Sequence, residues 1–175
     1  MTSRIMPGTS VSGILCLLGI ALFSTGCLGY RLGSTLPSDI RSVHVPPFVN
    51  ATTEPQLEND ITQATISEFQ KDSSLTIETM DRADSLLSVT LSKYELEPLR
   101  YETNDQKRAN EFRMKITAVV VFTRAKTGKQ LAKSTVVGES TFVAGTDMPT
   151  DKKAALPKAA QDLARRIVQA VVEAW

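Results

Sequence analysis

The segment FRMKITAVVVF, from Phe112 to Phe122, decides the predicted fold together with the segment Leu131–Val143 that follows it. Apolar and polar residues alternate at the start of FRMKITAVVVF and the segment then becomes fully apolar, a pattern typical of a β-strand. Thr127-Gly128-Lys129 has the composition of a tight hairpin turn. We therefore expect Leu131–Val143 to return as the antiparallel partner of the first segment.

Strand patterns also precede this hairpin. Leu86–Leu96 is expected to be a longer strand, and Pro98 is expected to end or bend it. Leu87, Val89 and Leu91 fall on one face of this strand, and Ser88, Thr90 and Ser92 fall on the other. Leu75–Met80 alternates in the same way over a shorter length. Ser42–Val45 is expected to be a further strand, with Phe48–Asn50 continuing it in extended form.

Two helices are expected, one near each end of this run of strands. Thr53 and Gln56 have the spacing of a capping box, so the first helix should begin there and end near Lys71. The second follows from an apolar stripe at helical spacing close to the C-terminus. Because Pro157 disfavours helix at the residue before it, we expect this helix to begin near Leu156–Pro157. The stripe comprises Leu156, Ala160, Leu163, Ile167, Val168 and Val171.

The order of these elements predicts the fold class. A crossover through a helix implies a parallel strand pair, whereas the later hairpins imply antiparallel strands. We expect an α+β two-layer sandwich, with two helices packed on one face of a mixed, mostly antiparallel sheet of about four strands. The sequence shows no internal repeat and no second domain.

The first 26 residues have the features of a secretory signal peptide. Arg4 is the only charged residue before Cys27, Val11–Phe23 is a continuous apolar run, and Ser24-Thr25-Gly26 is a patch of small residues. The run is shorter than the roughly 20 apolar residues that a membrane-spanning helix needs. The alternative is an N-terminal anchor helix that is never cleaved.

Cys27 is the only cysteine after the apolar run, and it follows the small-residue patch directly. Ser24-Thr25-Gly26-Cys27 resembles a lipobox, with Ser24 at the position where leucine is usual. The alternatives are a free thiol or a disulfide with Cys16, which would be removed with the signal peptide. Acylation accounts better for a lone cysteine in an oxidising compartment. We therefore predict lipid attachment at Cys27, including palmitate, with enough acyl chains for a durable anchor.

This prediction divides the chain into three parts. Residues 1–26 would be the signal peptide, residues 27–40 the lipidated N-terminus and tether, and residues 41–175 a single domain. Leu28, and not aspartate, follows the cysteine. By resemblance to the sorting rule for lipoproteins, this implies anchoring at the periplasmic face of the outer membrane.

The charge balance argues against nucleic acid as a partner. The chain holds 20 Lys and Arg and 19 Asp and Glu, and removal of Arg4 with the signal peptide leaves 19 of each. A nearly neutral domain lacks the strongly basic field of a nucleic-acid-binding protein.

Residues typical of catalysis are scarce, so we predict that the protein is not an enzyme and needs no cofactor or metal. His44 is the single histidine and has no ligand-type neighbour in the sequence. No glycine-rich loop has the phosphate-binding arrangement. Glu95 and Glu97 fall on the same strand face, where a general acid and base are possible but a solvated face is favoured.

Four stretches of the sequence resemble one family. They are Gly26–Leu32 (GCLGYRL), Leu36–Pro46 (LPSDIRSVHVP), Glu111–Met114 (EFRM) and Leu156–Val168 (LPKAAQDLARRIV). Their succession is similar to the LptE (RlpB) family of lipopolysaccharide-assembly lipoproteins. The resemblance implies two helices against a mainly antiparallel sheet, in agreement with the fold predicted above. It also implies a non-catalytic role, in which the protein plugs the LptD β-barrel, assists its assembly and contacts lipopolysaccharide.

Two basic pairs are candidates for contact with the phosphates of such a glycolipid. Lys107-Arg108 precedes the Phe112 strand, and Lys152-Lys153 is expected in the loop before the last helix, where long cationic side chains reach a ligand without being buried. Ordinary solvated surface cations are the alternative. A second function class also remains open: a lipoprotein adaptor, such as a pilotin-like chaperone for another outer-membrane channel.

Overall fold

The structure, a computed structural model, describes residues 36–101 and 109–173. These residues belong to one compact unit. In chain order the elements are β1 (Ser42–His44), β2 (Val49–Asn50), α2 (Leu57–Asp72), β3 (Thr76–Ile77), β4 (Ser85–Tyr101), β5 (Ala109–Arg124), β6 (Gln130–Val143) and α3 (Met148–Val172).

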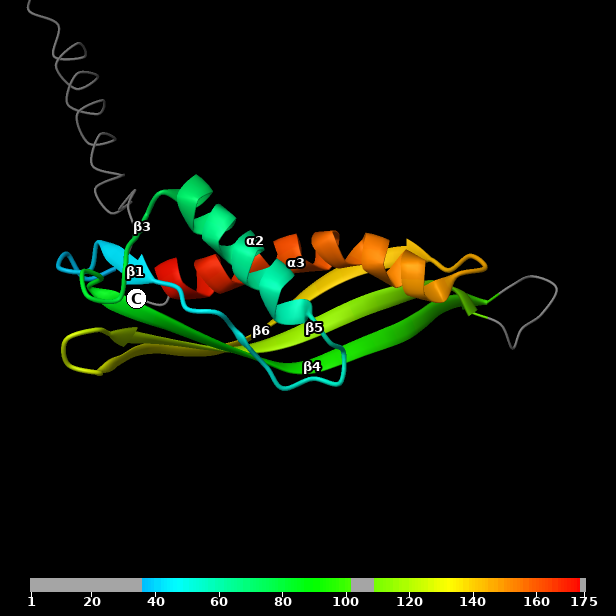
Figure 1. Ribbon diagram of the computed structural model, residues 1–175, viewed down its shortest axis with the longest axis horizontal. Coiled ribbons are helices and arrows are strands. Elements are labelled where there is room, and N and C mark those ends of the chain that lie inside the picture. Colours follow the sequence, from blue (N-terminus) through cyan, green and yellow to red (C-terminus); the bar gives the residue numbers. More distant parts are fainter. Residues whose placement is uncertain (1–35, 102–108, 174–175) are drawn as a thin grey trace, which may run out of the picture. The chain divides into compact units, whose positions relative to one another are not determined.

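The predicted α+β class is confirmed, and both helices lie on one side of a mixed sheet (Figure 1). The strand order is β3-β1-β4-β5-β6, and β2 pairs separately with β4. The pairs that involve β1, β2 or β3 are parallel, while β4, β5 and β6 form a long antiparallel meander.

The sheet has six strands and not the expected four or so. One reason is that the extended segment near the N-terminus forms two short strands instead of one. Val43 pairs with Ser85 and Val49 pairs with Thr90, and Pro46-Pro47 lies between them. Proline has no N–H to donate to a ladder, so pairing stops there and resumes farther along β4.

The hairpin between β5 and β6 is confirmed. Arg124 donates its backbone N–H to the Lys129 carbonyl at 2.9 Å, and Gly128 donates to the Arg124 carbonyl at 2.9 Å. Gly128 has a φ of 65°, which glycine adopts without steric cost. The turn residues therefore fix the register of β6 against β5.

β4 is longer than expected, because it continues past Pro98 to Tyr101. Its register against β5 shifts between Leu91 and Lys93, where Ser92 is the extra residue. A one-residue bulge reverses which side chains face each side of a sheet. Consequently Leu91 is buried against the helices, and beyond the bulge Tyr94 and Leu96 pack against the core in its place.

The predicted start of the first helix was wrong. α2 begins at Leu57, and Gln56 at its N-cap makes no side-chain capping hydrogen bond. The Asn50 side chain instead holds the residues between Asn50 and the helix in a turn. Its Oδ1 accepts the Thr52 N–H at 3.0 Å, and its Nδ2 donates to the Glu54 carbonyl at 2.8 Å. The predicted end near Lys71 is confirmed to within one residue.

The predicted start of the last helix was also wrong, because α3 begins at Met148 and passes through Pro157. The extra turns are held by tertiary contacts. Ala155 is buried, and Ser140 on β6 donates a hydrogen bond to the Ala155 carbonyl at 3.2 Å. Packing of this kind overrides the local preference against helix before a proline.

α3 approaches β6 closely at Gly138. A Cβ atom at Gly138 would overlap the Leu163 Cβ and lie 2.7 Å from the Leu163 Cα. Leu163, Ile167 and Val171 are fully buried, so the predicted apolar stripe does form the core-facing side of α3. The glycine thus lets the helix backbone settle directly onto the strand.

We predict that Gly138→Ala destabilises the protein by about 1–3 kcal/mol or more, because an extra methyl group overpacks this contact. The expected overlap with Leu163 outweighs the gain of about 0.4–1 kcal/mol that a glycine replacement brings through the unfolded chain. Urea unfolding measures the difference. Gly145→Ala is the control, since its Cβ would meet nothing closer than 3.4 Å. Equal stability of the two variants would contradict the close contact.

Candidate functional surface

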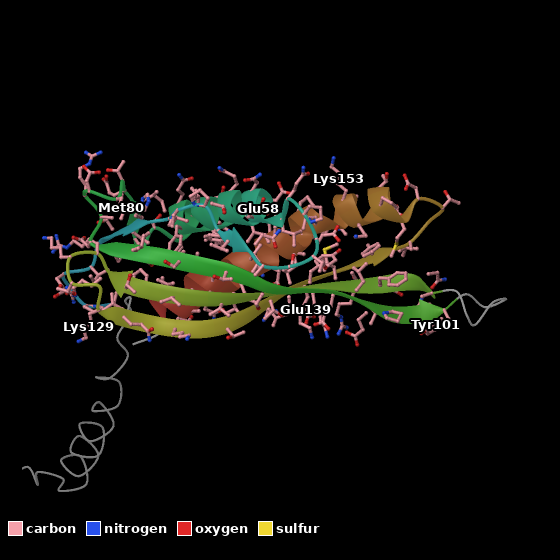
Figure 2. All side chains as sticks on the ribbon, turned by 60° about the horizontal axis from the view of Figure 1, so that its bottom comes forward. Glu58, Met80, Tyr101, Lys129, Glu139 and Lys153 are labelled. Atoms are coloured by element: carbon pink, nitrogen blue, oxygen red, sulfur yellow. The ribbon has the colours of Figure 1, made fainter. Side chains whose placement is uncertain are left out.

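The structure describes only part of the predicted site. Cys27, Lys107 and Arg108 lie outside the described residues. Lys152 and Lys153 lie in the early turns of α3 and not in a loop before it. Figure 2 shows Lys153 on the helix side of the sheet, and its side chain is exposed.

Lys152 takes part in a local network that the sequence did not predict. Its Nζ lies 2.8 Å from the Glu54 carboxylate and 5.4 Å from the centroid of the Tyr94 ring. The side chains of Lys152 and Glu54 are only 24% and 31% exposed. An ion pair combined with a cation–π contact makes Lys152 a structural cation that joins α3, β4 and the segment before α2.

No pattern in the sequence could have indicated this network. Glu54 and Lys152 are 98 positions apart. Tyr94 faces Lys152 only because of the bulge at Ser92, and Glu54 precedes α2 only because the Asn50 turn delays the helix. Only the complete fold brings Glu54, Tyr94 and Lys152 together.

A small cleft of about 270 Å³ lies beside this network. Met114 and Leu156 contribute apolar lining, and Glu54, Lys152 and Lys153 contribute charged groups. This volume is slightly below the range of about 300–1,000 Å³ that is usual for a small-molecule site. Within residues 36–101 and 109–173, no cluster of histidine, cysteine and acidic side chains is arranged to hold a metal ion.

The Tyr94 hydroxyl is a weaker acid than an ordinary tyrosine hydroxyl. Burial, followed by the nearby negative charge of Glu54, raises the pKa of Tyr94 to about 12. Both causes disfavour the phenolate. Because the folded-state pKa is raised, the stabilisation linked to the neutral phenol is complete below the ordinary pKa of about 10, and is lost as the pH rises towards 12.

We predict a late tyrosine ionisation near pH 12 in the ultraviolet absorbance after a rapid pH jump, and its absence in Tyr94→Phe. Glu54→Gln should move this ionisation to lower pH, because one of its two causes is removed. Persistence of the late ionisation in Tyr94→Phe, or no movement in Glu54→Gln, would contradict the assignment.

The face of β4, β5 and β6 that points away from the helices carries paired charges. Lys93 contacts Glu95 at 2.8 Å, Lys115 contacts Glu97 at 2.7 Å, and a third pair spans β5 and β6. The hydrogen bond from Lys115 lowers the pKa of Glu97. The two glutamates are therefore ion-paired members of a solvated strand face, as expected. The third pair is Arg113 with Glu139, at 3.7 Å.

The same face becomes less charged towards the β5–β6 turn. The strand register places valines and threonines side by side there, and none of these side chains is fully buried. We call the whole surface the open face (Figure 2). Its residues are Leu86, Ser88, Thr90, Lys93, Glu95 and Glu97 on β4, Arg113, Lys115, Thr117, Val119, Val121 and Thr123 on β5, and Lys133, Thr135, Val137, Glu139 and Thr141 on β6.

Balanced ion pairs next to β-branched side chains give the open face the mixed polar and apolar character of a protein-contact surface. Alternation of lysine, arginine and glutamate along β4 and β5 is its signal in the sequence. Neither of the two described helices combines the length and apolarity that a membrane crossing requires.

Several solved structures share the fold. A hypothetical protein from Chlamydia trachomatis has a TM-score of 0.55 at 10% identity, covering 75% of this chain and 95% of its own. A protein from Xanthomonas campestris has a TM-score of 0.55 at 11% identity, with 79% and 91% covered. The rare lipoprotein B of Shewanella oneidensis has a TM-score of 0.51 at 10% identity, with 76% and 96% covered.

No curated protein matches the sequence. A family model does match, and it covers the whole sheet, α2 and nearly all of α3. The model is that of LptE, described as lipopolysaccharide-assembly, and the match extends over residues 40–171. Because this match covers most of the chain, the chain belongs to the LptE lipopolysaccharide-assembly family.

Proposed function

We propose that the protein is an outer-membrane lipoprotein, anchored through Cys27, that partners and plugs an LptD-like β-barrel and assists lipopolysaccharide assembly there. The observation that carries this proposal is the family match over residues 40–171. The geometry supports it, because both helices cover one side of the sheet and leave the open face available to a partner.

The open face is chemically suited to the lumen of a wide barrel. Such lumens are polar, whereas the outer surface of the barrel is apolar. Three ion pairs on the open face present both signs of charge within a small area. At about 3.3 Å per residue, the 16 residues of β5 span about 50 Å, which exceeds the apolar band of about 25 Å of a barrel.

The predicted lipid anchor adds a second contribution. Two or more acyl chains hold a protein stably at a membrane, whereas one chain does not. A tether of residues 27–40 would keep the domain close to a membrane-embedded partner and raise its effective concentration. Weak individual contacts on the open face would then suffice for a durable complex.

A Cys27→Ser variant tests the anchor. We expect the variant to remain uncleaved or to become soluble, because the acylation site is lost. Membrane fractionation with salt and carbonate washes measures this. Normal cleavage with retention on the membrane through both washes would contradict lipidation at Cys27.

Pull-down of the wild-type protein from detergent-solubilised outer membranes tests the partner in the same preparations. The proposal expects an LptD-like barrel to co-purify in amounts close to one per copy of the protein. A different outer-membrane channel in its place would identify the protein as a pilotin-like chaperone or adaptor, which is the competing function.

The four candidate cations remain proposed lipopolysaccharide contacts, and the structure distinguishes two of them. Lys152 is engaged by Glu54 and Tyr94. Lys153 is exposed and pairs with no other described residue. We therefore expect Lys153 to contribute more than Lys152 to binding of an anionic headgroup.

Substitution of Lys107, Arg108, Lys152 and Lys153 by serine or glutamine should weaken lipopolysaccharide binding and reduce its dependence on salt, because charged contacts are screened by ions. Binding is measured at two salt concentrations. Lys153→Gln alone should reproduce more of the loss than the matched Lys152→Gln. If wild-type binding is measurable and neither its strength nor its salt dependence changes in the fourfold variant, these cations are not the contact.

A further inference from the structure

β6 is the last strand of the sheet and pairs with β5 along one edge. Among the described residues, no strand pairs with its other edge. The Glu139 N–H points to this edge, because it donates to the Asp162 carboxylate at 3.0 Å and not to β5. Inward and outward amides alternate along an antiparallel strand. The N–H and C=O groups of Lys133, Thr135 and Val137 therefore also point outward, since the β5–β6 register is unbroken through this stretch.

One part of this edge is covered and the other is not. Asp162 on α3 caps the edge at Glu139 and is itself held by Arg166, whose Nε lies 2.9 Å away. Natural sheets use such covers to prevent unwanted strand pairing. Within the described part of the chain, no side chain caps the amides of Thr135 or Val137 in this way.

A groove runs beside the uncovered part. It has a volume of about 480 Å³ and lies between β6 and the second half of α3. We call it the edge groove. Its lining residues are Ser134, Thr135, Val136, Val137, Arg166, Gln169, Ala170 and Glu173. A strand added to β6 at the usual spacing of about 4.8 Å would lie along this groove.

The edge is unsuited to a second copy of the same chain. Gly138 lies directly beneath Leu163, so α3 sits over β6. Packed helices need about 8–10 Å between their axes, whereas paired strands lie only about 4.8 Å apart. Antiparallel pairing of two β6 edges would therefore force two α3 helices into each other. The occupant must be an extended segment that carries no helix on this side.

We propose that the β6 edge from Lys133 to Val137 binds an extended segment of a partner protein by β-strand addition. The main chain of the segment would bond to the outward amides, and its side chains would alternate between the edge groove and the open face. Strand addition deepens the proposed function and rests on it only for the identity of the partner. The geometry of the edge specifies an extended strand as the ligand but does not specify its sequence.

The experiment uses the full mature chain and a soluble peptide of alternating threonine and valine with lysine at each end. Hydrogen exchange is followed for single amides by NMR. At a peptide concentration about ten times the dissociation constant, exchange of the Thr135 and Val137 amides should slow about tenfold. Two analogues, N-methylated on alternate amides, should differ, because only one row of peptide amides faces β6.

Variants of the protein complete the test. Thr135→Pro removes an outward N–H and should abolish the protection, since proline cannot donate to a strand. Thr141→Pro is the matched control, because Thr141 has the same orientation on β6 but lies outside the edge groove. It should retain peptide binding. The N-methylated peptides provide the same information without altering the protein if Thr135→Pro does not fold.

Equal binding of both methylated analogues, protection at other amides only, or unchanged binding to Thr135→Pro would overturn the inference. A concentration-dependent dimer that Thr135→Pro abolishes would also overturn it, by assigning the edge to a second copy. If the peptide fails to bind while an LptD-like barrel still co-purifies, strand addition is wrong and the proposed function stands.

Discussion

The contact between α3 and β6 at Gly138 is the constraint on which the rest of the architecture depends. A glycine at this one position lets the helix backbone reach the strand, with Leu163 directly above it. The helix then covers a long stretch of β6, and its inward stripe of Leu163, Ile167 and Val171 completes the core. The buried side chains of both helices therefore lie on one side of the sheet, and the other side stays free of helices.

Three surface features follow from this one-sided arrangement. The open face keeps its paired charges in solvent, because no helix covers it. Asp162 reaches over the sheet edge to Glu139, so part of β6 is capped and part is not. Near the start of α3, Lys152 forms an ion pair with Glu54 and a cation–π contact with Tyr94. These contacts hold the start of the helix against β4. All three features suit a protein that works through contacts with a partner.

The sequence predicted the elements with strong periodicity and missed those that depend on distant partners. The long hairpin and the buried stripe of α3 were predictable, because alternation and helical spacing are local signals. The start of α3 was not, since Ser140 and the packing of Ala155 stabilise turns that Pro157 argues against. The bulge at Ser92 was missed as well, although the apolar alternation changes phase there, from Leu87, Val89 and Leu91 to Tyr94 and Leu96. This bulge decides that Tyr94 faces Lys152.

The predicted site shows the same division. The solvated character of Glu95 and Glu97 followed from their alternation on one strand. The different environments of Lys152 and Lys153 could not be predicted, because they depend on Glu54, a residue far away in the sequence. Adjacent lysines look equivalent in a sequence, whereas the fold makes one a structural cation and leaves the other exposed.

The central claim is that the protein works through the sheet surfaces that α3 leaves uncovered. Hydrogen-exchange mass spectrometry of the full chain, alone and in the complex extracted from outer membranes, tests this most directly. The account predicts that protection on complex formation concentrates in peptides from β4, β5 and β6 and leaves the solvent side of α2 and α3 unchanged. Protection confined to the helices, with the three strands unaffected, would contradict it.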